Sequence, residues 1–292
     1  MDSVQVDAYL RRLGAGYPEE PTVESLRALH LRHLRTVPFE NLSVHLGEEI
    51  VLEEKRLWDK VVGGARGGGR GGFCYELNGL FGALLTALGY EVTPLAARVY
   101  GDGGRLGIPY DHMALLVRTA DGGDWLADVG FGAHSHGPLA FAERGGQVDP
   151  GGTFRVVEAG PDAAGVRGGP GGPGEAGPAA DLDVLRDGKR VYRVEVRPRV
   201  LDDFVSGAWW HSTSPRSHFL RSPVCSRLTE DGGRITLSGR RLTTTAVDGV
   251  RQERELDTDA DVLAAYRDHF AIHLDDVPSV PSAPTVPPVS RL

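Results

Sequence analysis

The spacing of the hydrophobic residues changes at Gly89, and this change limits what the 292-residue chain can fold into. Before Gly89 the apolar residues recur three and four positions apart, which places them on one face of a helix. After Gly89 they fall into short runs such as V-T-P-L-A-A-R-V-Y, separated by turns such as D-G-G at 121–123, as strands do. The pattern predicts a helical domain over residues 1–89 and a domain of short strands, in a barrel or a sandwich, over residues 90–200.

The last third of the chain is mixed. Residues 201–276 combine strand patterns with the amphipathic stretch A-D-V-L-A-A-Y-R-D-H-F, which is typical of a helix. Two segments are rich in glycine or proline. Residues 160–180 hold too few apolar residues to bury anything and are predicted to be a disordered hairpin tip. The proline-rich tail, 277–292, is predicted to be extended and mobile.

Charge and hydropathy exclude several classes of partner. The chain carries 32 basic and 40 acidic residues, a formal net charge of −8, which argues against nucleic-acid binding because phosphate backbones need clustered Lys and Arg. It opens without a basic leader, and no apolar run approaches the roughly 20 residues that a membrane span needs. We therefore expect no membrane partner and a cytoplasmic location. The two cysteines, Cys74 and Cys225, are expected to be free thiols in that compartment.

The stretch R-G-G-F-C-Y-E-L-N, residues 70–78, holds the first of these cysteines at the predicted start of a helix. Two glycines before Cys74 allow close backbone approach, and the N–H groups and dipole of a helix N-terminus favour a thiolate there. A cysteine also packs well as a small apolar residue at such a position. The local sequence leaves both interpretations open.

A nucleophilic cysteine needs a base, and the base needs an acceptor that orients it. His112 and Asp128 are the strongest candidates, because each interrupts an otherwise apolar strand pattern and would have to be paired if buried. A regular hairpin around 121–123 would place Asp128 opposite Leu115 or Leu116. A bulge, or curling of the chain beyond Gly130, would then be needed to bring it to His112, and the sequence does not supply that geometry.

Two other motifs give weaker evidence of a functional site. The run at residues 63–72 contains G-x-G-x-x-G, but a helix rather than a strand precedes it, so a dinucleotide site is not expected. The pairs His134 with His136 and His269 with His273 lack the acidic residue of a zincin helix. We expect no metal site and interpret these histidines as surface or core residues.

With these residues in view, the chain resembles the arylamine N-acetyltransferase family. The matching pieces run in family order: P-F-E-N-L at 38–42, R-G-G-F-C-Y-E-L-N, the strand of His112, D-V-G-F-G at 128–132 and S-T-S-P-R-S-H-F at 212–219. The glycine-rich residues 63–69, the insertion at 160–180 and the tail depart from the family pattern.

The resemblance implies an α+β multidomain fold: an N-terminal helical bundle, a central antiparallel β-barrel and, over 201–276, an α/β lid, around a cysteine-protease-like core. It implies that Cys74 is the acyl-accepting nucleophile, His112 its base and Asp128 the residue that orients the histidine. By position in the family motifs, three aromatic residues are expected to line the pocket for the acceptor: Phe39, Phe131 and Phe204.

The resemblance also implies the reaction. Acetyl-CoA is the expected cosubstrate, with no permanently bound cofactor, and an arylamine, hydrazine or hydroxylamine takes the acetyl group from a cysteine thioester. The nearest alternative is an amide synthase of the same family that releases or cyclises a carrier-bound polyketide. More distant alternatives are a cysteine hydrolase or transglutaminase, and a binding module with an unreactive Cys74. A homodimer is the candidate assembly.

Overall fold

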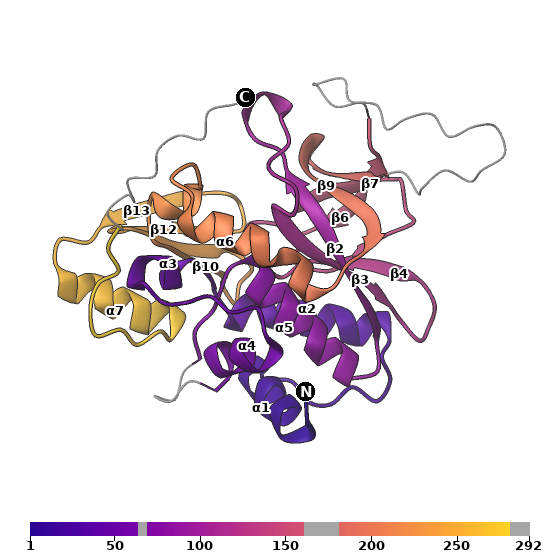
Figure 1. Ribbon diagram of the computed structural model, residues 1–292, viewed down its shortest axis with the longest axis horizontal. Coiled ribbons are helices and arrows are strands. Elements are labelled where there is room, and N and C mark those ends of the chain that lie inside the picture. Colours follow the sequence, from indigo (N-terminus) through magenta and orange to yellow (C-terminus); the bar gives the residue numbers. More distant parts are fainter. Residues whose placement is uncertain (64–68, 161–180, 281–292) are drawn as a thin grey trace.

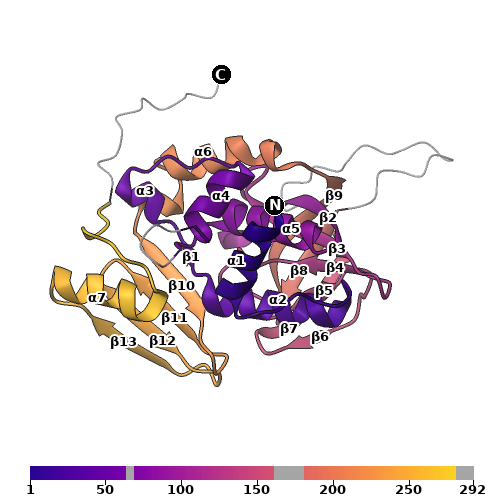
Figure 2. The ribbon, with the colours of Figure 1, turned by 90° about the horizontal axis from the view of Figure 1, so that it is seen from below.

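The computed structural model of the protein describes residues 1–63, 69–160 and 181–280. In these ranges the chain is mixed α/β, with helices gathered in its N-terminal part and two antiparallel sheets beside them (Figures 1 and 2). The helices are α1 (Ser3–Leu13), α2 (Val23–Thr36), α3 (Leu42–Leu46), α4 (Glu54–Val61), α5 (Cys74–Ala87), α6 (Val205–Thr213) and α7 (Asp259–Phe270), with 3-10 turns η1 (Asp102–Gly104), η2 (Leu201–Phe204) and η3 (His218–Leu220). The helical periodicity before Gly89 is thus confirmed.

Helix α5 lies among the other helices and against the larger sheet, in contact with α1, α4, β2 (Glu91–Val99) and β3 (His112–Arg118). Because neighbours surround it, its sequence is apolar on most sides rather than along one stripe. Helices α1, α2 and α7 each begin at a polar side chain that caps them. The side chains of Asp2, Thr22 and Thr258 accept hydrogen bonds from the first turn of each helix.

The larger sheet has eight strands among the described residues and is nearly closed into a barrel. Its order is β5-β4-β3-β2-β9-β8-β7-β6, and every neighbouring pair is antiparallel. The strands not yet given are β4 (Asp124–Ala127), β5 (Leu139–Ala140), β6 (Gln147–Asp149), β7 (Gly152–Glu158), β8 (Leu182–Arg186) and β9 (Lys189–Pro198).

The two edges of this sheet meet through one side chain. The amide of Gln147 on β6 accepts from the backbone N–H of Ala140 on β5 at 2.7 Å and donates to its carbonyl at 3.0 Å. These two bonds resemble the pair of backbone hydrogen bonds between neighbouring strands. They cover part of the open edges of β5 and β6, which would pair with each other in a closed barrel. The interior is filled by alternate residues of the strands, such as Phe154 and Val156 of β7.

The smaller sheet has the order β1-β10-β11-β12-β13, and α7 packs on it. Its strands are β1 (Phe39–Glu40), β10 (Val224–Leu228), β11 (Arg234–Ser238), β12 (Arg241–Thr245) and β13 (Arg251–Glu255). The sequence did not predict β1. This strand lies within the helical third of the chain, yet Phe39 pairs with Ser226 and Glu40 with Cys225. A segment next to the nucleophile motif therefore belongs to the C-terminal sheet.

Three expectations fall on residues that the structure does not describe. Strands β7 and β8, on either side of the predicted hairpin tip, do pair as a hairpin up to Glu158 and Leu182. The tip itself, residues 161–180, lies outside the described residues, as do residues 64–68 and 281–292. Expectations about the glycine-rich run and the tail therefore remain predictions.

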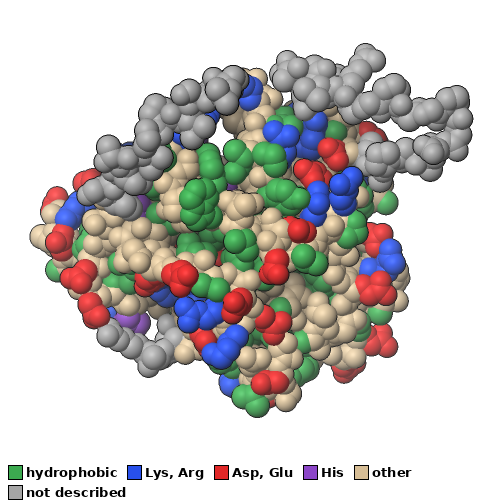
Figure 3. Space-filling model, viewed as in Figure 1, with side chains coloured by type: hydrophobic (Ala, Val, Ile, Leu, Met, Phe, Trp, Pro, Cys, Tyr) green, Lys and Arg blue, Asp and Glu red, His purple; other side chains and the backbone are tan. Residues whose placement is uncertain are grey.

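The face seen in Figure 3 carries hydrophobic side chains near its centre and charged side chains of both signs mainly around them. The exposed hydrophobic residues of η2, α6 and the residue before them are Val200, Val205 and Trp209. Figure 3 shows no broad area of lysine and arginine alone on this face. None of the helices in the described ranges is long and apolar enough to cross a bilayer.

Candidate active site

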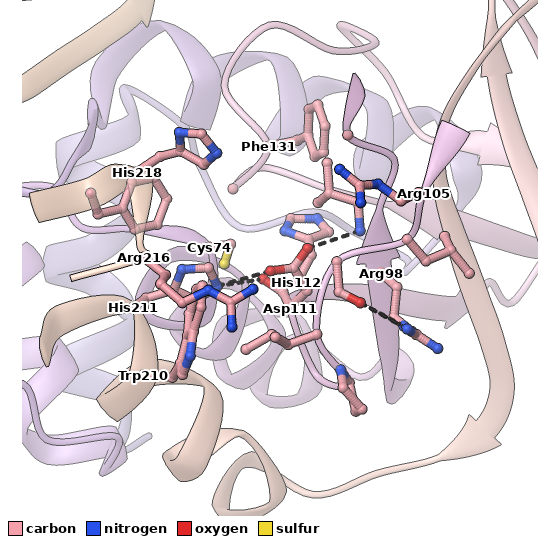
Figure 4. Close-up of a pocket in the computed structure, with 18 of the residues that line it drawn as sticks. Cys74, Arg98, Arg105, Asp111, His112, Phe131, Trp210, His211, Arg216 and His218 are labelled. Carbon is pink, nitrogen blue, oxygen red and sulfur yellow. Dashed lines mark hydrogen bonds and ion pairs between the residues drawn. The ribbon is translucent and has the colours of Figure 1, made fainter. Parts of the chain in front are cut away.

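Cys74 is the first residue of α5 and lies at the bottom of a cavity of about 810 Å³ (Figure 4). Its side chain is only 4% exposed. Glu76, two residues on, accepts a hydrogen bond from the backbone N–H of Phe73 at 3.1 Å and so fixes the first turn of the helix. The sulfur therefore sits at the positive end of a helix of 14 residues. Both cysteines are free thiols, as expected.

Two glycines let neighbouring segments approach the nucleophile. A Cβ at Gly71 would lie 1.8 Å from the carbonyl oxygen of Pro38, and one at Gly130 would lie 2.7 Å from Cα of Cys74. Any side chain at these positions would push P-F-E-N-L or D-V-G-F-G away from the start of α5. This contact explains why both glycine motifs accompany the cysteine, and it is a packing constraint rather than a need for unusual backbone angles.

The structure brings His112 and Asp128 together with Cys74. His112 Nε2 and Asp128 Oδ2 are 2.7 Å apart, and both side chains are buried. The side chain of Cys74 lies within hydrogen-bonding reach of the same imidazole, beside which its sulfur is seen in Figure 4. Because Nε2 faces Asp128, Nδ1 is the ring nitrogen left for the sulfur.

The predicted register of this hairpin was wrong. Leu115 pairs with Ala127 and Leu116 with Leu126, so β4 ends one residue before Asp128. Continuing the same register would set Asp128 opposite Ala114, two residues from His112 and on the same face of the sheet. Diagonal neighbours of this kind are within reach of long side chains, so neither a bulge nor a curl is needed to join them.

The charges of this pair stabilise one another in a dry site. Burial lowers the pKa of His112, but the charge and hydrogen bond of Asp128, with a contribution from Cys74, outweigh it and raise that pKa to about 10. Burial raises the pKa of Asp128, and His112 overrides it and lowers the value to about 2. Both pKa shifts indicate that His112 is a charged imidazolium and Asp128 a carboxylate at neutral pH.

Asn78 holds Asp128 from the same helix that carries the nucleophile. Its Nδ2 donates to Asp128 Oδ1 at 2.9 Å and to the carbonyl of Met113 at 2.6 Å, while its Oδ1 accepts from the N–H of Val129 at 3.0 Å. This role of Asn78 was not predicted from the sequence. The signal was available, because Asn78 lies four residues after Cys74 and therefore on the same face of α5.

His30 of α2 holds Asp128 from the other side. Its Nε2 accepts from the backbone N–H of Asp128 at 3.2 Å, which requires the proton on Nδ1, and Nδ1 then donates to the carbonyl of His136 at 3.0 Å. Burial lowers the pKa of His30, so it is neutral. No motif marks this residue, since a histidine at an apolar helix position has no distinctive spacing.

Aromatic rings surround the imidazole of His112. Phe131 and Tyr192 lie with their ring centroids 5.2 and 5.3 Å from it. His134 stacks on Tyr192 at 5.3 Å and is buried. Its pKa is lowered to about 4, mainly by burial. This histidine is therefore a neutral core residue, in agreement with one of the two interpretations offered by the sequence.

The segment before His112 is held under strain. Tyr110 has φ 57°, a left-handed conformation that side chains other than glycine rarely adopt, and its carbonyl accepts from the hydroxyl of Tyr75 at 2.6 Å. Asp111 accepts from the N–H of Val99 at 3.1 Å. His211 Nε2 of α6 lies 3.2 Å from Asp111 Oδ1 and 3.0 Å from its carbonyl. A residue next to the nucleophile and one from α6 thus fix the entry to β3.

The cavity lies between the loop before β3 and the segment of α6 and η3. Of the three aromatic residues predicted to line it, Phe39 and Phe131 do. Phe204 is fully buried outside the cavity, against Tyr75 and Tyr110. Further residues that were not predicted to line the cavity also do so: Arg98, Arg105, Asp111, Trp210, His211, Arg216, His218 and Phe219.

A buried ionic network supports the start of α5 from below. Lys60 Nζ lies 2.7 Å from Glu76 Oε1 and 3.7 Å from Glu40 Oε1. Arg70 adds contacts to Glu40 at 3.0 Å and to Glu48 at 2.7 Å. The network joins α4, β1 and α5, so the three segments around the nucleophile are tied by charge as well as by packing.

Comparisons with known proteins agree with this geometry. A family model described as N-acetyltransferase matches residues 22–279. The chain is 30% identical over 269 residues to the arylamine N-acetyltransferase of Escherichia coli (strain K12), covering 92% of this chain and 89% of the relative. It is 38% identical over 159 residues to proansamycin X synthase of Amycolatopsis mediterranei (strain S699), covering 54% of this chain and 60% of that relative.

Solved structures match over nearly the whole chain. The arylamine N-acetyltransferase from Salmonella typhimurium superposes with a TM-score of 0.80 and 31% identity, covering 95% of this chain and 94% of that one. The Mycobacterium marinum arylamine N-acetyltransferase in complex with CoA superposes with a TM-score of 0.75 and 29% identity, covering 91% and 92%. The likeness therefore extends over both sheets and the helices.

Proposed function

Because the chain belongs to the arylamine N-acetyltransferase family, we propose that it moves an acetyl group from acetyl-CoA to an arylamine, arylhydrazine or arylhydroxylamine through a thioester on Cys74. The observation that carries the proposal is the 2.7 Å pair of His112 and Asp128 beside the thiol at the first turn of α5. A cysteine, an imidazole and a carboxylate in this order are the parts that nucleophilic acyl transfer requires.

In the first step the Cys74 thiolate attacks the thioester carbonyl of acetyl-CoA. The tetrahedral intermediate expels CoA as a thiolate, which can take the proton of the His112 imidazolium, and the acetyl group stays on the sulfur. In the second step the amine attacks the acetyl-enzyme, His112 accepts the amine proton, and the Cys74 thiolate leaves. Asp128 keeps the imidazole in one tautomer and stabilises its charged form throughout.

The cavity suits both substrates in turn. Its volume of about 810 Å³ lies within the usual range of small-molecule sites. Phe39 and Phe131 offer apolar faces to an aromatic acceptor, and Arg105 and Arg216 at the mouth offer positive charge to the phosphates of CoA. CoA is present in the complex of the Mycobacterium marinum relative, which supports a CoA thioester as cosubstrate here. No metal or permanently bound cofactor has a step in this scheme.

We extend the proposal to the organisation of the chain. A helical domain over 1–89, a barrel domain over 90–200 and an α/β lid over 201–276, around a cysteine-protease-like core, fit the arrangement of the two sheets. A cytoplasmic location and a homodimer complete it. Light scattering of the purified chain would test the dimer: the mass of a single 31.3 kDa chain would contradict it.

An amide synthase is the second candidate, favoured by the 38% identity to proansamycin X synthase over part of the chain. Its reactive residues would be the same, and only the acyl donor would differ. The arylamine N-acetyltransferase relatives match over a larger share of the chain, so acetyl transfer is the better-supported reaction.

Intact-mass analysis after mixing the chain with acetyl-CoA, without an amine, tests the proposal. We expect a gain of one acetyl group in the wild type and in Cys225→Ala, and no gain in Cys74→Ala. Addition of an arylamine should then remove the acetyl group. No gain with acetyl-CoA, together with acylation by longer carrier-bound thioesters, would replace acetyl transfer by the amide synthase. Iodoacetamide labelling of Cys74 no faster than that of Cys225 would instead support a non-enzymatic module.

A further inference from the structure

A second cavity, of about 650 Å³, lies on a different side of the molecule from Cys74. It is enclosed by α2, by the segment of β5 and β6, and by the turns at the tips of the C-terminal sheet, which approach one another in Figure 2. None of its lining residues also lines the cavity of Cys74. The proposed acetyl transfer therefore makes no use of it.

Cationic side chains and unpaired donors meet in this second cavity. The cations are Arg27 and Arg35, which line it together with the imidazole of His136, and the guanidinium of Arg27 lies 4.8 Å above the ring of Trp125. The sole ion pair of Arg35 among the described residues is a loose one, 3.7 Å to Glu230. Arg35 Nε and Trp125 Nε1 are buried donors without a hydrogen-bond partner in the described ranges. Buried donors of this kind are costly unless an acceptor reaches them.

Three acidic side chains, Glu143, Asp149 and Asp231, also line the cavity, but none of them forms an ion pair with Arg27 or Arg35 among the described residues. Asp149 accepts from the backbone N–H groups of His136, Gly137 and Gly151 at 2.7 to 3.1 Å. Asp231 accepts from the hydroxyl of Thr229 and from the N–H of Gly233. Glu143 accepts from the N–H of Gly145, so all three carboxylates are held by their own segments, while Arg27 and Arg35 make no close ion pair among the described residues and keep N–H donors for a ligand.

Two more arginines lie close enough to add to this field. Burial lowers the pKa of His136; the charge of Asp149 raises it, and the positive charges of Arg234, Arg35 and Arg186 lower it. Arg234, whose side chain makes one hydrogen bond among the described residues, to Ser226 Oγ at 3.2 Å, has its pKa lowered to about 10 by burial and by Arg186. A cluster of cations that is partly removed from water is stabilised by an anion between them.

The rim of the cavity is apolar on both sides. Val148 of β6 is 90% exposed and Val247, in the turn after β12, is 62% exposed, and both line the opening. Leu31 and Leu139 continue this surface inward. A ligand that fits would carry an apolar part as well as a charged one.

We propose that this cavity is a second binding site, for a small organic anion whose carboxylate or phosphate group lies between Arg27 and Arg35 and whose apolar body packs against Val148 and Val247. Guanidinium groups pair with both kinds of anion, and the unpaired donors of Arg35 and Trp125 are satisfied by their oxygens.

Calorimetric titration of the full chain with benzoate, phenyl phosphate and inorganic phosphate tests the site. Benzoate and phenyl phosphate separate a carboxylate ligand from a phosphate ligand, and at least one of them is expected to bind. Arg35→Gln should weaken that binding about tenfold or more, the usual effect of losing one charge-assisted contact. Arg11→Gln, which removes an exposed charge from α1, should not.

Val148→Asp is the second variant. It changes a side chain that is 90% exposed, so the fold should tolerate it, and its charge at the rim should repel either anion. Both Arg35→Gln and Val148→Asp should still gain one acetyl group on Cys74, which separates this proposal from the proposed reaction.

Four results would overturn the proposal: no binding of either organic anion at millimolar concentration, equal binding by the wild type and both variants, loss of binding in Arg216→Gln, which would assign the ligand to the cavity of Cys74, or inorganic phosphate binding as tightly as phenyl phosphate.

Discussion

A histidine as deeply buried as His112 is ordinarily neutral, because burial disfavours its charged form. Asp128 reverses that preference by a hydrogen bond of 2.7 Å and by its charge. Since the folded pKa of His112, about 10, lies above its ordinary 6.5, the pair stabilises the fold fully below pH 6.5 and loses this contribution as the pH rises through 10. At acid pH the contribution is lost as Asp128 is protonated, below its ordinary 3.8 and through about 2.

We predict that Asp128→Asn lowers the pKa of His112, because burial then acts without a compensating charge. NMR titration of the imidazole should show a midpoint near pH 10 in the wild type, and a lower one in the variant. Urea unfolding should agree: the difference in stability between wild type and variant should shrink from pH 6 to pH 10. An unchanged midpoint would mean that Asp128 does not hold the charge of His112.

His30 is predicted to position Asp128 without touching any reacting atom. His30→Ala would leave the N–H of Asp128 and the carbonyl of His136 unpaired, at a cost of about 1–3 kcal/mol for each group. Acetylation of Cys74 should slow while the concentration of acetyl-CoA at half-maximal rate stays unchanged. His30→Gln should restore part of the rate, because an amide offers one acceptor and one donor.

The matched control for His30 is His33, which lies one turn later on α2, is equally buried and bonds to the hydroxyl of Tyr9 at 2.8 Å instead. His33→Ala should lower stability without a comparable loss of acetylation rate. Equal loss of rate in both alanine variants would reduce His30 to an ordinary core residue.

At the scale of elements, the start of α5 depends on charges contributed by α4 and β1. We predict that Lys60→Met destabilises the fold by about 3 kcal/mol, because Glu76 and Glu40 would be left buried without this cation. Burial already raises the pKa of Glu76, so the variant should take up a proton on folding. Urea unfolding with a pH electrode in unbuffered solution measures both effects.

Two further variants test whether the loss of stability comes from the buried charge pair. Lys60→Met combined with Glu76→Gln should regain part of the stability, since glutamine removes the charge and still accepts from Phe73. Lys55→Met breaks a similar pair with Asp59 on the exposed side of the same helix and should have a much smaller effect. A loss as large in Lys55→Met would show that helix propensity, and not the buried pair, is responsible.

The sequence predicted most elements but not the pairings between distant ones. The helices α1, α2, α4, α5 and α7 follow from hydrophobic period, and several strands of the larger sheet from short apolar runs. Strand β1 has only two residues and no pattern of its own, so local sequence could not reveal that it pairs with β10. The hairpin register was wrong because turn residues fix a register only to within one position.

The site, like the fold, was predictable only where local sequence marks a residue. Cys74, His112 and Asp128 stand out because a polar residue interrupts an apolar run or ends a glycine motif. Asn78 and His30 do not, because each acts through a hydrogen bond to a segment 50 or 98 residues away. Phe204 illustrates the opposite case: an aromatic residue carried over by position packs behind the cavity instead of lining it.

For the whole molecule, Asn41 is predicted to join the N-terminal part to the C-terminal sheet. Its amide donates to the carbonyls of Phe219 and Ser222 at 2.9 and 3.0 Å and accepts from the N–H of Val224 at 2.7 Å. Asn41→Ala should cost at least about 2 kcal/mol in urea unfolding, because the carbonyl of Ser222 and the N–H of Val224, both partly buried, lose their partner, whereas the carbonyl of Phe219 keeps His45.

The acceptor should also bind more weakly to Asn41→Ala, since Phe219 lines the cavity. The control is Gln252→Ala, which removes an amide from the exposed edge strand β13. If Asn41→Ala were as stable as this control, the joint between the two parts would rest on strand pairing alone.

The pairing of β1 with β10 has a consequence for synthesis on the ribosome. Asn41 and Val224 are 183 residues apart in the chain, so the motif beside the nucleophile is translated long before its partner strand. Until that strand emerges, the nascent polypeptide presents an open backbone edge next to Cys74 and has no finished cavity. Truncation anywhere between the end of α5 and the start of β10 should therefore yield a chain that retains the reactive cysteine but offers chaperones and proteases a persistent target.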